Sequence, residues 1–373
     1  MKIAFTGGGT GGHFYPILAV AEEIQKIKEQ EGLNDLSLYF LSNTPYDQKL
    51  LDSHSIQFIK IPAGKVRTYF SPRNILDFFV TSIGILVAII RLLIIYPDVI
   101  FGKGGYASFP TLFAARLLAI PVVIHDSDTV PGRVNKWAGK FARRVAISWE
   151  EAAEFFPEAK TAVTGQPVRE ALRTPIKEGS FEHFSFQPGP VLCVLGGSQG
   201  AQRINDFILD MLPTLVEQFQ VIHQTGEKNF KDMEARARII FEKAKGKERY
   251  KAVPTLDEEG MRRMAGITTL IVSRSGSGIL EFAHWGIPSI LIPIPEEISR
   301  DQRTNAYSLA RRKGAAVIEE KNLTEAVFLS ELKRITDNQG GYVAMRDALK
   351  SLAHPEAGKQ IAEELIRITR SHK

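Results

Sequence analysis

Short apolar runs alternate with longer stretches of helical periodicity along almost the whole chain. In the first half the apolar runs predict strands at 2–5, 37–41, 57–61, 98–101, 122–125 and 144–147. In the second half they predict strands at 191–195, 220–223, 250–253, 270–272, 289–292 and 316–318. The helical stretches between them include 15–29, 73–95 and 110–119. Strands that alternate with helices are typical of βα units, so we expect two doubly wound α/β halves with parallel sheets.

A glycine-rich turn follows the first predicted strand. Residues 7–12 read Gly-Gly-Gly-Thr-Gly-Gly, and His13 comes directly after them. Because glycine has no Cβ, backbone N–H groups can approach an oxyanion or a diphosphate at the positive end of the following helix. The turn therefore predicts a ligand that carries phosphate or develops negative charge. His13 adds a titratable side chain at the mouth of the same turn.

The glycines at 7, 9 and 12 also match the spacing of the dinucleotide-binding fingerprint. That fingerprint requires an acidic residue near the end of the second strand, where it holds the adenosine ribose. Here the second predicted strand runs into 42–44, which read Ser-Asn-Thr, so its tip carries no carboxylate. The sequence thus argues against binding of NAD or FAD.

Other polar groups follow predicted strands or breaks. The cluster 125–128, His-Asp-Ser-Asp, is expected either at a carboxyl-end crevice or as the cap of the next helix. The turn 273–278 opens a helix with Glu281, whose carboxylate suits either the two hydroxyls of a ribose or the helix dipole. Arg169 follows a break at 164–168, and its guanidinium can bind two phosphate oxygens or form a surface salt bridge.

The composition is ordinary for a globular protein of two domains, with 373 residues, 44% of them hydrophobic and 24% charged. A net charge of +5 suits anionic lipid or nucleotide ligands and is too weak to indicate nucleic acid. The single cysteine, Cys193, excludes an internal disulfide. The eight histidines are scattered without HxxxH or CxxC spacing, so we expect no metal site. The N-terminus shows no signal peptide, which predicts a cytosolic protein.

One segment has an unusually apolar sequence. No charge occurs from Phe78 to Ile90, and the apolar run resumes after Arg91. Between Asp77 and Arg91 the run is shorter than the roughly 18–20 residues of a transmembrane helix. The segment is therefore either a core helix or a helix with one face on the core and another at a membrane interface. Composition alone favours the core helix.

Several motifs occur in one order along the chain. They are Gly-Gly-Gly-Thr-Gly-Gly-His-x-x-Pro at 7–16, Phe-Gly-Lys-Gly-Gly-Tyr at 101–106, His-Asp at 125–126 leading to Pro-Gly-Arg-Val-Asn-Lys at 131–136, Gly-Gln-Pro-Val-Arg at 165–169, Gly-Gly-Ser-Gln-Gly-Ala at 196–201, Ser-Arg-Ser-Gly at 273–276 with Glu281, and Gln302 with Asn-Ala at 305–306. With these motifs the chain resembles, nearly from end to end, the MurG family of lipid-linked N-acetylglucosaminyltransferases of peptidoglycan synthesis.

The resemblance implies a GT-B type fold, in which two Rossmann-like domains face a central cleft. It implies an N-terminal domain that comprises 1–165 and the C-terminal helix at 356–373. This domain would take a lipid acceptor and associate with the membrane. A domain at 166–355 would bind the donor, UDP-N-acetylglucosamine (UDP-GlcNAc). The implied reaction is the inverting transfer of GlcNAc to undecaprenyl-diphosphate-linked muramoyl-pentapeptide, which converts lipid I to lipid II. Beyond the donor substrate, no cofactor and no metal would be required.

The resemblance also assigns expected roles to residues. His13 has the chemistry and the position of a general base for the acceptor hydroxyl. The helix that begins near Ser198 and the guanidinium of Arg169 would stabilise the leaving UDP, and Glu281 would hold the ribose. The other substrate-binding residues expected are Thr10, Gly11, Gly12, Asp128, Leu256 and Gln302.

The same resemblance implies a peripheral protein at the cytoplasmic face of the plasma membrane. Its expected partners are an anionic membrane surface and proteins of cell-wall synthesis and division, with no nucleic acid among them. The apolar segment 75–95 would then be the family's membrane-associating patch, which reverses the preference for a core helix that composition alone gives.

The chain departs from the family's pattern at three places. The family shows His-Glu-Gln-Asn where residues 125–128 of this chain read His-Asp-Ser-Asp, so Asp128 stands in the place of the asparagine. A carboxylate cannot donate a hydrogen bond, as an asparagine amide can, unless it is protonated. The loop from Arg274 to Glu281 is one residue shorter than usual, and Arg303 adds a positive charge beside Gln302. Another GT-B lipid glycosyltransferase, a UDP-sugar epimerase and a non-catalytic sugar-nucleotide-binding protein stay open as alternatives.

Overall fold

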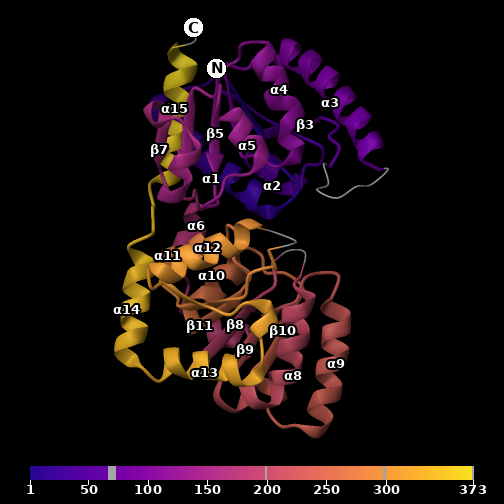
Figure 1. Ribbon diagram of the computed structural model, residues 1–373. Coiled ribbons are helices and arrows are strands. Elements are labelled where there is room, and N and C mark those ends of the chain that lie inside the picture. Colours follow the sequence, from indigo (N-terminus) through magenta and orange to yellow (C-terminus); the bar gives the residue numbers. More distant parts are fainter. Residues whose placement is uncertain (66–72, 198–199, 297–299, 372–373) are drawn as a thin grey trace. The chain divides into compact units, whose positions relative to one another are not determined.

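The computed structural model describes residues 1–65, 73–197, 200–296 and 300–371 (Figure 1). The chain divides into two compact units. The first comprises Met1–Arg169 with His354–Lys373, and the second comprises Glu170–Ala353. The C-terminal segment therefore belongs to the unit in which the chain begins. With the boundaries that the sequence predicts, after 165 and after 355, Arg169 would fall in the second unit, whereas the structure groups it with the first.

A parallel sheet forms the centre of the first unit, with the strand order β3-β2-β1-β4-β5-β6-β7. Its strands are β1 (Lys2–Thr6), β2 (Ser37–Ser42), β3 (Ile56–Lys60), β4 (Val99–Gly102), β5 (Val122–Asp126), β6 (Arg144–Ile147) and β7 (Thr161–Val163). All residues of β4 and β5 are buried, as expected of continuous apolar runs covered by helices on both faces.

Helices cover both faces of this sheet (Figure 1). They are α1 (Gly11–Glu31), α2 (Gln48–Ser53), α3 (Arg73–Ile95), α4 (Phe109–Leu117), α5 (Arg133–Ala138) and α15 (Ala357–Ser371), with short 3₁₀ turns at Tyr106–Ser108, Glu150–Phe155 and Glu158–Lys160. The C-terminal helix α15 packs on α1, where Gly358 lies so close that a Cβ would come within 3.3 Å of the carbonyl oxygen of Ala19. This packing attaches the end of the chain to the first unit.

The second unit repeats the architecture with the strand order β10-β9-β8-β11-β12-β13, again parallel. Its strands are β8 (Val191–Leu195), β9 (Gln220–Gln224), β10 (Tyr250–Val253), β11 (Leu270–Ser273), β12 (Ser289–Leu291) and β13 (Ala315–Val317). Its helices are α6 (Glu170–Arg173), α7 (Ser180–His183), α8 (Gln202–Gln218), α9 (Phe230–Lys243), α10 (Glu258–Ile267), α11 (Ile279–Trp285), α12 (Arg300–Arg311), α13 (Glu325–Thr336) and α14 (Gln339–Lys350), with 3₁₀ turns at Lys247–Arg249 and Glu320–Asn322. Cys193 is buried in β8, and burial raises the pKa of its thiol.

In both sheets the strand order reverses beside the first strand of the unit. The strand β1 lies between β2 and β4, and β8 lies between β9 and β11. Ligands of open α/β sheets bind outside the carboxyl ends of the strands at such a reversal. The glycine-rich turns that follow β1 and β8 both lie at this position, so each unit offers its own ligand-binding edge.

The long helix α3 packs on α4 through only part of its surface. Ala88 and Leu92 are fully buried, but large apolar side chains cover the rest of the helix and are exposed. These are Ile75, Leu76, Phe78, Phe79, Ile83, Leu86, Ile90, Leu93 and Ile94. The preference for a core helix, drawn from composition alone, is therefore wrong for this face. Among the described residues α3 is also the one helix that is long and apolar enough to cross a membrane, by length and composition only.

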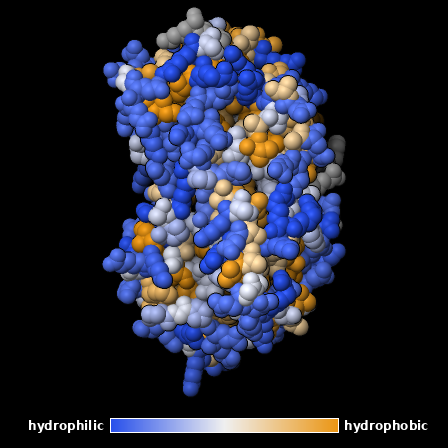
Figure 2. Space-filling view, turned by 90° about the vertical axis from the view of Figure 1, so that its left-hand side faces the viewer, coloured by the Kyte–Doolittle hydropathy of each residue, from blue (hydrophilic) through white to orange (hydrophobic). Residues whose placement is uncertain are grey.

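The face of the first unit that carries α15 looks different (Figure 2). Hydrophilic residues predominate there, and apolar residues form scattered spots between them. Single exposed apolar residues are normal on protein surfaces, whereas a contiguous apolar face marks an interaction site. The exposed face of α3 belongs to the second kind.

Candidate functional site

The turn between β1 and α1 holds the first group of predicted site residues. Gly9 has a φ of +92°, a left-handed backbone that favours glycine. Thr10 precedes α1 with an extended backbone, and its side chain makes no capping hydrogen bond to the first N–H groups of the helix. Those N–H groups lie at the positive end of a 21-residue helix. Thr10, Gly11 and Gly12 thus surround a position suited to an anion.

His13 lies in the first turn of α1 and is partly buried. Its Nδ1 atom is 3.0 Å from the hydroxyl oxygen of Thr10, and its ring also interacts with the backbone of Gly8. Burial, helped by the nearby charge of Lys103, lowers the pKa of His13 to about 4. The imidazole is therefore neutral at neutral pH and can accept a proton, as a general base must.

Sequence reasoning missed Lys103, which follows β4 directly. Its side chain is only 2% exposed. Its Nζ atom donates a hydrogen bond to Ser127 Oγ, and Ser127 in turn donates to Gln166 Oε1 at 2.6 Å. Burial lowers the pKa of Lys103 to about 8. A lysine between glycines at the end of a buried strand is the signal that could have identified it.

The polar cluster after β5 contains two aspartates with different surroundings. The carboxylate of Asp126 is buried and accepts hydrogen bonds from the backbone N–H groups of Asp128 (3.0 Å) and Gly132 (3.2 Å) and from Asn135 Nδ2 (2.8 Å). Burial raises the pKa of Asp126 in spite of these donors. Asp126 thus holds the chain before α5, a structural role. Asp128 is only half-buried, and its substrate-binding role stays a prediction.

The break at 164–169 brings Arg169 to the start of α1. Its guanidinium carbon lies 4.9 Å from the centre of the Tyr15 ring, a cation–π contact within the first unit. Arg169 is buried, and the carbonyl oxygen of Gly165 is 3.0 Å from Nε2 of the buried His125. These contacts fix the segment near the turn after β1, where a guanidinium could meet phosphate oxygens.

The turn after β8 is the corresponding feature of the second unit. Gly197 has a φ of +74°, and Ser198 lies outside the described residues. One turn into α8, the Oδ1 atom of the buried Asn205 is 3.0 Å from His223 Nε2, and His223 Nδ1 is 3.0 Å from the hydroxyl of Tyr250. These hydrogen bonds connect α8 to β9 and β10 and hold the helix start in place.

Glu281 and Gln302 flank the turn after β11. Glu281 lies half-buried in the first turn of α11. The hydroxyl of Ser275 donates to the backbone oxygen of Gln302 at 2.7 Å. Gln302 Oε1 is buried and, within the described part of the chain, has no hydrogen-bond partner. A buried carbonyl oxygen in this state is stabilised by a donor such as a ligand hydroxyl. Leu256, half-buried before α10, lies in the same unit.

Two arginines near this turn are engaged by protein groups. Arg274 Nη1 donates to the backbone oxygen of Ile292 at 3.0 Å, and Arg274 Nη2 pairs with Glu320. Arg303 pairs with Glu296 at 3.1 Å and with Glu319 at 2.9 Å. The positive charge of Arg303 beside Gln302 is therefore balanced by two carboxylates.

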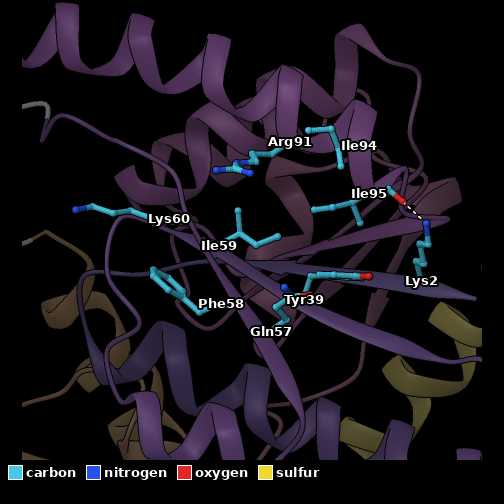
Figure 3. A pocket seen from close by; sticks show the side chains of 9 residues that line it. All are labelled: Lys2, Tyr39, Gln57, Phe58, Ile59, Lys60, Arg91, Ile94 and Ile95. Carbon is cyan, nitrogen blue, oxygen red and sulfur yellow. Dashed lines mark hydrogen bonds between the residues drawn. The ribbon is translucent and has the colours of Figure 1, made fainter.

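A separate groove of about 440 Å³ lies between α3 and the strands β2 and β3 (Figure 3). Its lining combines apolar side chains with three cationic ones, and it contains none of the predicted site residues. The lining residues are Lys2, Tyr39, Gln57, Phe58, Ile59, Lys60, Arg91, Ile94 and Ile95. Lys2 Nζ donates to the carbonyl oxygen of Ile95 at 2.6 Å, and the other two cations of the lining, Lys60 of β3 and Arg91 of α3, are exposed.

No three His, Cys, Asp or Glu side chains are grouped as metal ligands would be, as far as the described ranges extend. The carboxylates of Asp126 and Asp128 attract the buried ammonium of Lys103, and that ammonium in turn repels a protonated His13. Whether the reaction needs a metal ion stays a matter of prediction.

Two family models match the two units. The glycosyltransferase family 28 N-terminal domain matches residues 3–147, and the glycosyltransferase family 28 C-terminal domain matches residues 191–361. Among curated relatives, the UDP-N-acetylglucosamine–N-acetylmuramyl-(pentapeptide) pyrophosphoryl-undecaprenol N-acetylglucosamine transferase 2 of Bacillus cereus is 34% identical over 367 residues. That match covers 98% of this chain and 99% of the relative. The transferase of the same description from Staphylococcus aureus is 35% identical over 353 residues, 91% of this chain and 94% of the relative.

Solved structures agree on the fold. The crystal structure of MurG from Acinetobacter baumannii matches with a TM-score of 0.70 at 24% identity, over 98% of this chain and 99% of that one. A UDP-GlcNAc 2-epimerase from Neisseria meningitidis, bound to UDP-GlcNAc, matches with a TM-score of 0.69 at 17% identity, over 98% and 100%. At these identities the likeness concerns the fold. The expected fold class, two Rossmann-like α/β domains of the GT-B type, is confirmed.

Proposed function

Since the chain belongs to the MurG family of N-acetylglucosamine transferases, we propose that it transfers GlcNAc from UDP-GlcNAc to lipid I and so forms lipid II. In this reaction an acceptor hydroxyl of the muramoyl sugar attacks the anomeric carbon of GlcNAc. A bond from that carbon to the acceptor oxygen forms, the bond to the UDP oxygen breaks, and the configuration inverts. The hydroxyl proton goes to a base, and UDP leaves with the additional negative charge.

His13 is the proposed base. The observation that carries the proposal is its position, in the first turn of α1 beside the glycine-rich turn that suits a diphosphate. The low pKa of His13 keeps the imidazole neutral over the physiological range. An anionic acceptor bound beside it would raise that pKa towards the working pH, which makes the imidazole a stronger base once the substrate is in place.

The donor is proposed to bind to the second unit. Glu281 would accept hydrogen bonds from the ribose hydroxyls, and the buried Oε1 atom of Gln302 would accept one from a hydroxyl of the sugar. The start of α8, near Ser198, would face the diphosphate. Arg169 is proposed to bind phosphate oxygens as the charge on UDP develops.

Membrane association is proposed to be peripheral and to use the exposed apolar face of α3. The exposed cations Arg91 and Lys60, at the edge of the adjoining groove, favour a surface with anionic lipids (Figure 3). A nucleotide-sugar donor supports a location at the cytoplasmic face, where proteins of cell-wall synthesis and division are the proposed partners. The apolar face also separates this proposal from an epimerase, because an epimerase has no lipid-linked substrate.

Transfer of labelled GlcNAc from UDP-GlcNAc to a synthetic lipid I analogue tests the proposed function. We expect a labelled lipid product from the unmodified chain and a much slower reaction from His13→Ala. An acceptor without the muramoyl sugar is the matched control and should stay unlabelled. Conversion of UDP-GlcNAc to its 2-epimer, without label in the lipid, would instead identify an epimerase.

A further inference from the structure

One buried positive charge in the first unit has no role in the mechanism proposed above: the ammonium group of Lys103. A buried lysine loses its hydration, and such a charge persists only where other groups compensate for that loss. Its Nζ atom has a neutral hydrogen-bond partner, Ser127 Oγ, whose own hydrogen is donated to Gln166. The compensation therefore has to come from carboxylates nearby.

Four titratable side chains share this part of the unit with Lys103. Asp126, the last residue of β5, and Asp128, two residues later, attract the ammonium. His13 of α1 and His125 of β5 are repelled by it when they are protonated. Each carboxylate favours the charged lysine, and the charged lysine favours neutral imidazoles. His125 is tied to a backbone carbonyl and is fully buried, so His13 is the imidazole at the proposed reaction site.

The backbone keeps Lys103 and His13 together. The N–H group of Lys103 donates to the carbonyl oxygen of Thr6 at 2.8 Å, which joins the loop after β4 to the end of β1. A Cβ on Gly7 would come within 3.1 Å of Lys103 Cβ. A Cβ on Gly105 would come within 3.3 Å of His13 Cε1. The loop that carries Lys103 thus packs directly against the imidazole and against the glycine-rich turn.

We propose that Lys103 is a positioning residue for the transfer reaction: its ammonium, balanced by Asp126 and Asp128, adds to the effect of burial in keeping the imidazole of His13 neutral. The inference rests on the proposed function, in which His13 is the base. Lys103 is covered by protein, so it acts through His13 and not on the substrate. Without its charge the imidazolium of His13 would no longer be repelled, and an imidazolium cannot accept a proton.

The test compares Lys103→Met with Lys103→Arg. The first removes the charge, and the second keeps a permanent one. In the chain with native Lys103 we expect the imidazole signal of His13, followed by NMR and assigned with His13→Gln, to show no titration above pH 5. In Lys103→Met its midpoint should rise by about one pH unit or more, because the like charge is gone, and should stay below the ordinary histidine value, because burial remains. In Lys103→Arg it should stay low.

The acid limb of the pH–rate profile should move in parallel. The rate of Lys103→Met on the lipid I analogue should begin to fall about one pH unit or more above the pH at which the rate of the native chain falls, whereas the profile of Lys103→Arg should match that of the native chain. The KM for UDP-GlcNAc should stay constant, because Glu281 and Gln302, proposed to hold the ribose and the sugar, lie in the other unit. Lys49→Met, which removes an exposed charge from α2 of the same unit, is the matched control and should move neither midpoint. Lys103→Gln provides a second neutral variant in case Lys103→Met does not fold.

Two results would overturn the role of Lys103. One is a neutral variant, folded by thermal unfolding, in which the His13 midpoint stays where the native chain has it. The other is a Lys103→Arg protein that behaves like Lys103→Met, which would indicate a structural need for the lysine itself. Normal turnover of His13→Gln would be a different failure, since it would remove the base of the proposed function on which the inference rests.

Discussion

Replacing Phe79 and Leu86 of α3 by serine should release the protein from anionic vesicles and leave its fold intact. Phe79 is 59% exposed and Leu86 is 62% exposed, whereas Leu92 on the same helix is fully buried. Surface substitutions away from caps, charges and cores usually change the free energy of unfolding by about 0.5 kcal/mol or less. The thermal unfolding transition should therefore stay cooperative, with a nearly unchanged midpoint.

The loss of membrane affinity follows from the exposed fractions. Moving a whole Phe or Leu side chain from water into an apolar phase is worth about 1.5–3 kcal/mol. Since roughly three fifths of each side chain is accessible, the pair would contribute about 2–4 kcal/mol if both enter the lipid. Because each 1.4 kcal/mol corresponds to a factor of ten, binding should weaken by roughly 30- to 700-fold.

Co-sedimentation with vesicles of phosphatidylglycerol and phosphatidylcholine, at increasing lipid concentration, measures this change. The matched control replaces Ile239 and Val327 by serine, because both are exposed apolar residues of the second unit. That control should bind vesicles like the unmodified chain. Unchanged binding of the α3 variant would refute the assignment of this face to the membrane. Loss of its cooperative unfolding would show instead that Phe79 and Leu86 belong to the core.

Three further predictions concern the site itself. Glu281→Ala should weaken UDP binding by about 1.5–3 kcal/mol, the range for a hydrogen bond to a charged group; an unchanged affinity in calorimetry would remove Glu281 from the ribose site. His13→Ala should lower turnover on the lipid I analogue by about 10²–10⁴-fold, the usual contribution of a general base, with little change in UDP affinity; normal turnover would make Asp128 the next base to test. Saturating chelator should leave the initial rate unchanged, and a rate that falls with chelator and returns with Mg²⁺ would contradict a metal-independent reaction.

The strands could be predicted from the sequence almost to the residue. The expected strands at 144–147, 191–195 and 250–253 have the bounds found for β6, β8 and β10. Buried parallel strands need unbroken apolar runs, and such runs can be recognised in the sequence without knowing which strands pair with one another. The missed strand β7 has three residues at the edge of the sheet, two of them exposed, so no apolar run marks it.

Helix α1 begins four residues before its predicted start. Glycine has a low helix propensity, so local pattern assigns 11–12 to the turn, whereas the structure includes both in the first helical turn. The N–H groups of Gly11 and Gly12 therefore lie at the N-terminal end of the helix. The helix start, and with it the anion position, packs closely against Tyr15 and Tyr46, since a Cβ on Gly11 would lie 2.9 Å from the Tyr46 hydroxyl oxygen and 3.0 Å from Tyr15 Cε2.

The surroundings of the site's charged groups could not be read from local sequence, because they depend on the pairing of strands. Asp126 and Asp128 are two residues apart, and nothing in the pattern tells which of them is buried. The end of β5 buries Asp126 against three N–H donors and leaves Asp128 half-exposed.

Lysine is a residue type that is almost always exposed. Lys103 is buried because β4 pairs between β1 and β5, and its ammonium lies beside Ser127 near Asp126 and Asp128 at the end of β5. A charge in that position has to be balanced by Asp126 and Asp128, so a change at 103 should be energetically coupled to a change at 126 or 128, although more than twenty residues of sequence separate them.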